Sequence, residues 1–152
     1  MTRPSFTFRL ERVRALRERA EDLAKEELAS SLSLRFEGES MLRSAQAELE
    51  QARATRRFST EGGGTSAAEL AAAQAYLEKT VRRREAAALD LDRQDAEVDS
   101  RRSALEQAAR ERQVLEKLKE RRRSEHAVKA ARAESAALDE LALSVHRREV
   151  GA

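Results

Sequence analysis

The chain has 152 residues, of which 38% are charged and 3% aromatic, and its 30 basic and 28 acidic side chains give a net charge of +2. This composition is too poor in bulky apolar residues for a compact globule of this length and is typical of a long helix or coiled coil. The absence of cysteine excludes a disulfide framework, cysteine-ligated zinc and a thiol nucleophile. The N-terminus lacks the apolar run of a secretory signal, and no window could span a bilayer. We therefore expect a cytoplasmic protein.

The sequence predicts an all-α fold, a long antiparallel two-helix coiled-coil hairpin whose second helix is longer than the first. We expect helix one over about 5–58, a turn over 59–65 and helix two over about 66–148, within a single elongated domain 1–152. The corner is indicated by the stretch FSTEGGGTSAAEL, where three consecutive glycines interrupt strong helix formers. Ser66 and Glu69 then have the spacing of a capping box, which predicts that the second helix starts at Ser66.

Apolar residues of the first helix recur at steps of three and four, the spacing of a coiled-coil seam, meaning the stripe of residues that faces the partner helix. The predicted seam consists of Val13, Leu16, Ala20, Leu23, Leu34, Gly38, Leu42, Ala45, Leu49 and Ala52. Glu27 and Ser30 or Ser31 interrupt it. Glycine costs about 1 kcal/mol relative to alanine inside a helix, so Gly38 marks a close backbone approach or a bend.

The second helix continues the pattern. Its predicted seam consists of Leu70, Ala73, Leu77, Val81, Ala88, Leu91, Val98, Leu105, Ala108 and Leu115, with Arg84, Arg102 and Arg112 on the same stripe. If the chain folds back at the glycines, Phe8 should lie near position 116. The last 30 or so residues of the second helix would then extend beyond the first helix.

This extension opens with the most distinctive run of the chain, ERQVLEKLKERRRSEHAVKAARAESAALDELA, from Glu111 to Ala142. Arg121, Arg122 and Arg123 are consecutive and must spread around the helix. They form either a solvated helix surface or a surface that contacts a partner.

Two segments resemble FliJ, the small coiled-coil component of the bacterial flagellar type III export apparatus. In the opening FTFRLERVRALRERAEDLAKEELA, an aromatic-x-aromatic-Arg-Leu start is matched by Phe6, Phe8, Arg9, Leu10 and Val13. In the late VLEKLKERRRSEHAVKAARAESAALDELA, Val114 to Arg121 match a Leu-Glu-Lys-Leu-Lys-Glu run. His126 departs from the family pattern, which has a tyrosine at this position.

The resemblance implies a stalk-like coiled coil that binds the hexameric export ATPase through the end carrying both termini, stimulates it, and contacts the export gate and export chaperones. It implies roles in flagellum biogenesis, motility and chemotaxis. The protein would lie at the basal body, peripheral to the inner membrane and reaching it only through the export apparatus. The candidate ATPase contacts are Leu115, Lys117, Leu118, Lys119, Arg121, Arg122 and Arg123. Phe6, Phe8, Leu10 and Val13 would form the terminal seam, against which Leu115 and Leu118 close.

At the other end, the glycine corner is flanked by aromatic side chains. Phe58, Tyr76 and the neighbouring Leu77 are candidate contacts for the gate, because aromatic anchors are enriched at interfaces. A residue at the edge of the seam would have the same pattern, and this alternative stays open.

An enzyme is not expected, and the sequence predicts no catalytic, cofactor-binding or metal-binding residues. His126 and His146 would lie about 30 Å apart on one helix, and the glycines are not followed by the lysine of a P-loop. A basic coiled-coil scaffold or a nucleic-acid-binding protein is the alternative. The interleaved acidic residues, the low net charge and the lack of an aromatic pair for base stacking argue against a specific nucleic-acid partner.

Overall fold

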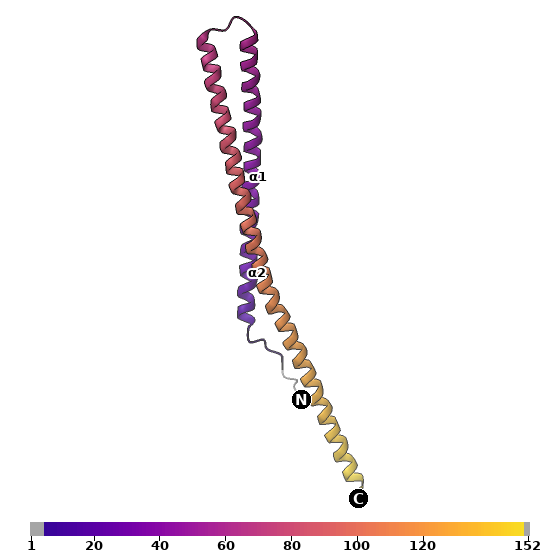
Figure 1. The fold of residues 1–152 in the computed structure, drawn as a ribbon. Coiled ribbons are helices and arrows are strands. Elements are labelled where there is room, and N and C mark those ends of the chain that lie inside the picture. Colours follow the sequence, from indigo (N-terminus) through magenta and orange to yellow (C-terminus); the bar gives the residue numbers. More distant parts are fainter. Residues whose placement is uncertain (1–4, 151–152) are drawn as a thin grey trace. The chain divides into compact units, whose positions relative to one another are not determined.

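The computed structural model describes residues 5–150 and contains two α-helices, α1 (Glu11–Glu61) and α2 (Ala67–Val150). They run antiparallel and pack against each other (Figure 1), and α2, with 84 residues, is longer than α1, with 51. The predicted all-α fold with a longer second helix is confirmed. Contacts divide the chain into two units: unit 1 contains residues up to Glu21 and from Ala108 on, and unit 2 contains Asp22–Gln107.

The helix expected from Ser5 begins only at Glu11, and an extended segment precedes it. In this segment Phe6 and Phe8 are half-buried, whereas Ser5, Thr7 and Arg9 are exposed. Side chains two residues apart point the same way in an extended chain but to different faces of a helix. The extended conformation therefore lets both aromatic rings face α2.

The corner between the helices is a short loop closed by local hydrogen bonds. The amide of Gly62 donates to the Phe58 carbonyl at 3.0 Å, and Gly63 adopts a positive φ of 65°, the left-handed conformation common where helices end. The Thr65 hydroxyl donates to the Ser59 carbonyl at 2.7 Å. α1 thus extends three residues past Phe58, and the turn lies later in the chain than expected.

The predicted capping box at the start of α2 is confirmed. The amide of Ser66 donates to Glu69 Oε2 at 2.8 Å, and the amide of Glu69 donates to Ser66 Oγ at 3.2 Å. The hydrogen bond from the Ser66 amide lowers the pKa of Glu69, because it favours the ionised carboxylate. The cap is therefore complete at neutral pH and weakens as the pH falls through the folded-state pKa of Glu69.

The second half of the predicted α1 seam is confirmed, and the first half is wrong. The confirmed residues are buried or half-buried: Gly38, Leu42, Ala45, Leu49 and Ala52. In contrast, Leu23 and Leu34 are 57% and 53% exposed, and Leu16 is exposed as well.

The seam of the first half follows from the seven-residue repeat of a coiled coil. A helix that turns Gly38, Leu49 and Ala52 toward its partner must also turn position 35, rather than position 34, in that direction. The residues found on the seam in this half are accordingly Arg14, Glu21, Ala24, Leu28, Ser31 and Arg35, all buried or half-buried. The inner side of this half of α1 is therefore largely polar.

The predicted α2 seam agrees better with the structure. Val98 is 2% exposed, and the half-buried members are Ala73, Leu77, Val81, Ala88, Leu91, Leu105, Ala108 and Leu115. Arg84 and Arg112 are half-buried as predicted, whereas Arg102 is exposed. The sequence reading missed Thr80, which is 1% exposed, and its buried hydroxyl is satisfied by donating to the Leu77 carbonyl at 2.8 Å within the same helix.

Gly38 is a point of close approach between the helices of unit 2. A β-carbon at this position would overlap the side-chain amide of Gln94. Gln94 Oε1 is buried and has no hydrogen-bond partner in the described part of the chain. The absence of a side chain at Gly38 gives this amide its space, so the contact at Gly38 is with a side chain of α2 and not the predicted close approach of the backbone.

Cross-helix ion pairs define the register within each unit. In unit 2, Arg101 pairs with Glu27 at 2.6 Å, Arg83 pairs with Glu48 at 2.8 Å, and Arg35 pairs with Asp95. In unit 1, Glu116 pairs with Arg14 rather than lying opposite Phe8, so the predicted register is displaced by about six residues.

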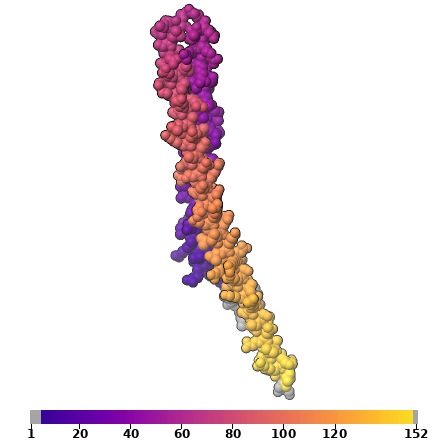
Figure 2. Space-filling model, viewed as in Figure 1, coloured from indigo at the N-terminus to yellow at the C-terminus, as the bar shows by residue number. Residues whose placement is uncertain are grey.

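The contact between the described N-terminal segment and α2 reaches further along α2 than expected. The contact of α2 with the N-terminal segment of unit 1 reaches His126, whose ring meets that of Phe6. Residues 131–143 are all exposed, and Figure 2 shows this yellow part of α2 with no other described segment covering the face in view.

We predict that the loop tolerates insertion and that its cap does not tolerate removal. A Cβ at Gly63 would have no neighbour within 4 Å, so adding several Gly or Ser residues after Gly63 should leave the helical circular dichroism nearly unchanged.

Ser66→Ala should lower the free energy of unfolding by about 0.5–2 kcal/mol, because an amide at the start of α2 loses its acceptor. A large loss of helicity on insertion, or no effect of Ser66→Ala, would contradict this description of the corner.

Candidate functional site

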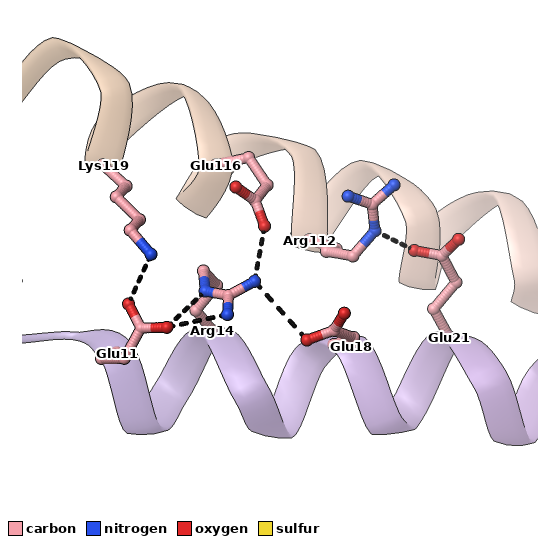
Figure 3. Close-up of polar contacts among 7 residues, drawn as sticks. All are labelled: Glu11, Arg14, Glu18, Glu21, Arg112, Glu116 and Lys119. Carbon is pink, nitrogen blue, oxygen red and sulfur yellow. Dashed lines mark hydrogen bonds and ion pairs between the residues drawn. The ribbon is translucent and has the colours of Figure 1, made fainter.

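Arg14 is the centre of the ion-pair cluster that joins α1 to α2 in unit 1 (Figure 3). Its guanidinium donates to Glu11 at 2.9 Å, to Glu116 of α2 at 2.8 Å, and to Glu18 at 3.5 Å. The bonds to Glu11 and then to Glu116 raise the pKa of Arg14. Arg14 therefore stays charged at every accessible pH and bridges the two helices.

Two further pairs flank Arg14. Lys119 of α2 binds the second oxygen of Glu11 at 2.9 Å, and Arg112 of α2 donates to Glu21 (Figure 3). The pKa of Glu11 is lowered, first by the hydrogen bond from Arg14 and then by that from Lys119. Glu21 is only 7% exposed, so its pair with Arg112 is the most buried of these contacts.

The N-terminal segment and α2 border a groove in unit 1. Its volume is about 780 Å³, and it is bordered on one side by residues 5–10 and on the other by Leu118, Arg122, Glu125, His126 and Lys129. The rings of Phe6 and His126 lie 5.7 Å apart between centroids, tilted by 58°. His126 thus contributes its ring to the contact between α2 and the N-terminal segment.

The candidate ATPase contacts divide into two groups. Leu115, Leu118 and Lys119 are half-buried, and Lys119 is engaged with Glu11. Lys117, Arg121, Arg122 and Arg123 are exposed, and Arg121 donates to Glu125 at 3.0 Å. Only the second group presents charge to a partner without first breaking a contact between α1 and α2.

The candidate terminal-seam residues also differ among themselves. Phe6 and Phe8 are half-buried, whereas Leu10 and Val13 are 39% and 40% exposed. Leu10 and Leu118 border the same groove. In this region the aromatic residues supply the contact with α2, and the aliphatic residues remain partly in water.

The candidate gate contacts lie in unit 2, near the corner. Phe58 is 80% exposed and Tyr76 is 50% exposed, whereas Leu77 is half-buried. Leu77 borders a shallow groove together with Arg53, Arg56 and Arg57. The structure does not bring Phe58 into this groove.

The sequence reading missed Arg14 and Glu21 as seam residues because it sought only apolar positions. The signal was present: Arg14, Glu21, Leu28, Arg35, Leu42 and Leu49 follow one another at seven-residue intervals. Opposite charges at the corresponding positions of α2, such as Arg112 and Glu116, complete this pattern.

Between residues 5 and 150 there is no group of three or more His, Cys, Asp or Glu side chains that could hold a metal ion. Neither helix contains a stretch apolar enough to cross a membrane.

The fold and its ion-paired seam define an antiparallel two-helix coiled coil. A family model described as flagellar FliJ protein matches residues 6–151, and the chain belongs to this family. It is therefore a coiled-coil protein associated with flagellar export. No curated protein and no solved structure matches the chain.

We predict that the pair of Glu21 and Arg112 acts as a unit. Arg112→Ala should lower the thermal midpoint, because a buried carboxylate loses the arginine that pairs with it. Glu21→Leu/Arg112→Leu should restore the midpoint, since leucine at both positions removes the charges and fills the seam. Thermal unfolding followed by circular dichroism measures both effects.

Arg102→Ala is the matched control. Arg102 is exposed and contacts only Asp99 of its own helix among the pairs found, at 3.5 Å, so its loss should change stability by less than about 0.5 kcal/mol. Equal effects of Arg112→Ala and Arg102→Ala would show that the buried pair has no special role.

Proposed function

We propose that this protein binds the hexameric flagellar export ATPase through unit 1 and stimulates its activity. Unit 1 contains both the start of α1 and the C-terminal part of α2. The observation that carries the proposal is the exposed basic run of Lys117, Arg121, Arg122 and Arg123 on α2, within the late segment that resembles the family. Charges at the rim of an interface speed association and select partners.

The proposal includes contacts with the export gate and with export chaperones. The exposed rings of Phe58 and Tyr76 in unit 2 are the side chains best suited to anchor a transient partner. The protein would then lie in the cytoplasm at the basal body and reach the inner membrane through the export apparatus. Membership of the FliJ family supports this role.

The test is ATPase stimulation by Arg121→Ala/Arg122→Ala/Arg123→Ala over a salt series. The three arginines are exposed, and the bond between Arg121 and Glu125 is a surface pair of small value, so the variant should fold as the wild type does. It should associate more slowly with the ATPase and show a flatter salt dependence, because steering charge is lost.

Arg132→Ala/Arg147→Ala/Arg148→Ala is the matched control, with the same charge change at exposed positions of α2. It should stimulate like the wild type. If both triple variants stimulate like the wild type at every salt concentration, Arg121–Arg123 are only a solvated surface. If the wild type neither binds nor stimulates the cognate ATPase, the proposed function is wrong.

A further inference from the structure

The groove of unit 1 has an apolar floor that is not fully covered. Phe6, Phe8, Leu10 and Leu118 contribute to its lining, and Leu10 keeps 39% of its surface in water. The contact between the rings of Phe6 and His126 holds the extended segment against α2. A groove of about 780 Å³ is within the size range of sites that receive a small group of side chains.

The charges around the floor are unbalanced. Arg9, Arg122 and Lys129 border the groove, are exposed, and have no ion pair with another described residue. Glu125 is the only carboxylate among the lining residues of the described chain, and it accepts a hydrogen bond from Arg121. The groove therefore has an excess of positive charge that no lining carboxylate balances.

Other cations of unit 1 are engaged within the protein. Arg14, Arg17, Arg112 and Lys119 each pair with a carboxylate across the two helices. Arg9, Arg122 and Lys129 differ from these in that they border partly exposed apolar surface, where a ligand could contact both the charge and the apolar side chains.

We propose that this groove binds an acidic peptide segment that carries an apolar side chain. The apolar side chain would cover Leu10 and Leu118, while carboxylates on either side of it would pair with Arg9, Arg122 and Lys129. Such a segment buries apolar area and neutralises three charges together, which gives the contact both affinity and orientation. The inference goes beyond the proposed function, because it holds whichever protein carries the segment.

A peptide fits the groove better than a nucleic acid or a membrane. Nucleic-acid binding depends on many phosphate contacts, whereas the groove offers three cations and has carboxylates nearby on Glu125 and Glu120. The rings of Phe6 and Phe8 are half-buried, and that of Phe6 already contacts His126, so the groove does not offer a row of aromatic rings for successive bases. A membrane surface is flat, and the apolar side chains here line a concavity.

The test uses the full chain and the fluorescein-labelled peptide Asp-Glu-Leu-Glu-Asp-Phe-Glu, with binding followed by fluorescence anisotropy at about 150 mM salt. Arg9→Ser/Arg122→Ser/Lys129→Ser should weaken binding by about tenfold or more, since it removes all three cations. Arg12→Ser/Arg19→Ser/Arg132→Ser is the matched control. It makes the same charge change at exposed residues of unit 1 that do not line the groove, and it should weaken binding by less than about threefold.

The apolar contact is tested separately. A peptide with serine in place of its leucine and phenylalanine should bind the wild type several times more weakly. The difference in affinity between the two peptides should be smaller for the Leu10→Ser variant, because that substitution removes part of the surface that the apolar side chains of the peptide cover. Circular dichroism of each variant confirms that the helices are intact.

Three results would overturn the inference. The first is failure of the wild type to bind the peptide below about 1 mM. The second is an equal loss of binding in the two triple variants, which would indicate non-specific attraction between charges. The third is tighter, groove-dependent binding of a DNA duplex or of vesicles containing phosphatidylserine. ATPase binding assayed in parallel separates the two proposals, because either can fail while the other holds.

Discussion

The structure depends on a single constraint: two helices can hide only one narrow seam from water. Among the described residues, the buried apolar side chains are Ala24, Leu49, Ala52 and Val98, and the buried polar ones include Glu21 and Thr80. So little apolar area contributes modest stability, and it does not by itself select one register over another. Charged residues on the seam supply that selection, because a displaced register would leave buried charges without their partners.

This division of roles explains how the surface can be used for binding. Arg14, Arg112 and Lys119 hold α1 to α2 in unit 1, whereas Arg122 and Lys129 point charge at the solvent. Arginine and lysine side chains therefore have two roles in this protein. Those that face a carboxylate across the helices hold the helices together, and those that do not face one present their charge to the solvent. A protein built in this way can present a charged surface to a partner without weakening its own helix pairing.

Several features could be predicted from the sequence, because glycine runs, caps and apolar heptads are local signals. These features are the corner, the capping box, the second half of the α1 seam and most of the α2 seam. The first half of the α1 seam could not be predicted from apolar residues, since Leu16, Leu23 and Leu34 form a well-spaced stripe on a face that does not contact α2. The phase of that half is set by Gly38, Leu49 and Ala52 further along the same helix. The groove could not be predicted either, because it requires the extended conformation of residues 5–8 and the contact between Phe6 and His126. The roles of Lys117, Arg121, Arg122, Arg123, Phe58 and Tyr76 toward partners stay predictions.

The most direct test of this account is the reactivity of single cysteines, introduced one at a time into a chain that has none. Ala24→Cys and Ser31→Cys place a thiol on the polar seam of unit 2, where both native residues are buried, and Leu23→Cys and Leu34→Cys place one on the exposed apolar stripe. The alkylation rate of each folded variant is compared with its rate in denaturant. The account predicts that positions 24 and 31 react at least about tenfold more slowly when folded, while positions 23 and 34 react at nearly the same rate in both conditions. Protection of positions 23 and 34, with free reaction at 24 and 31, would show that the helices pair through the leucines and would contradict the account.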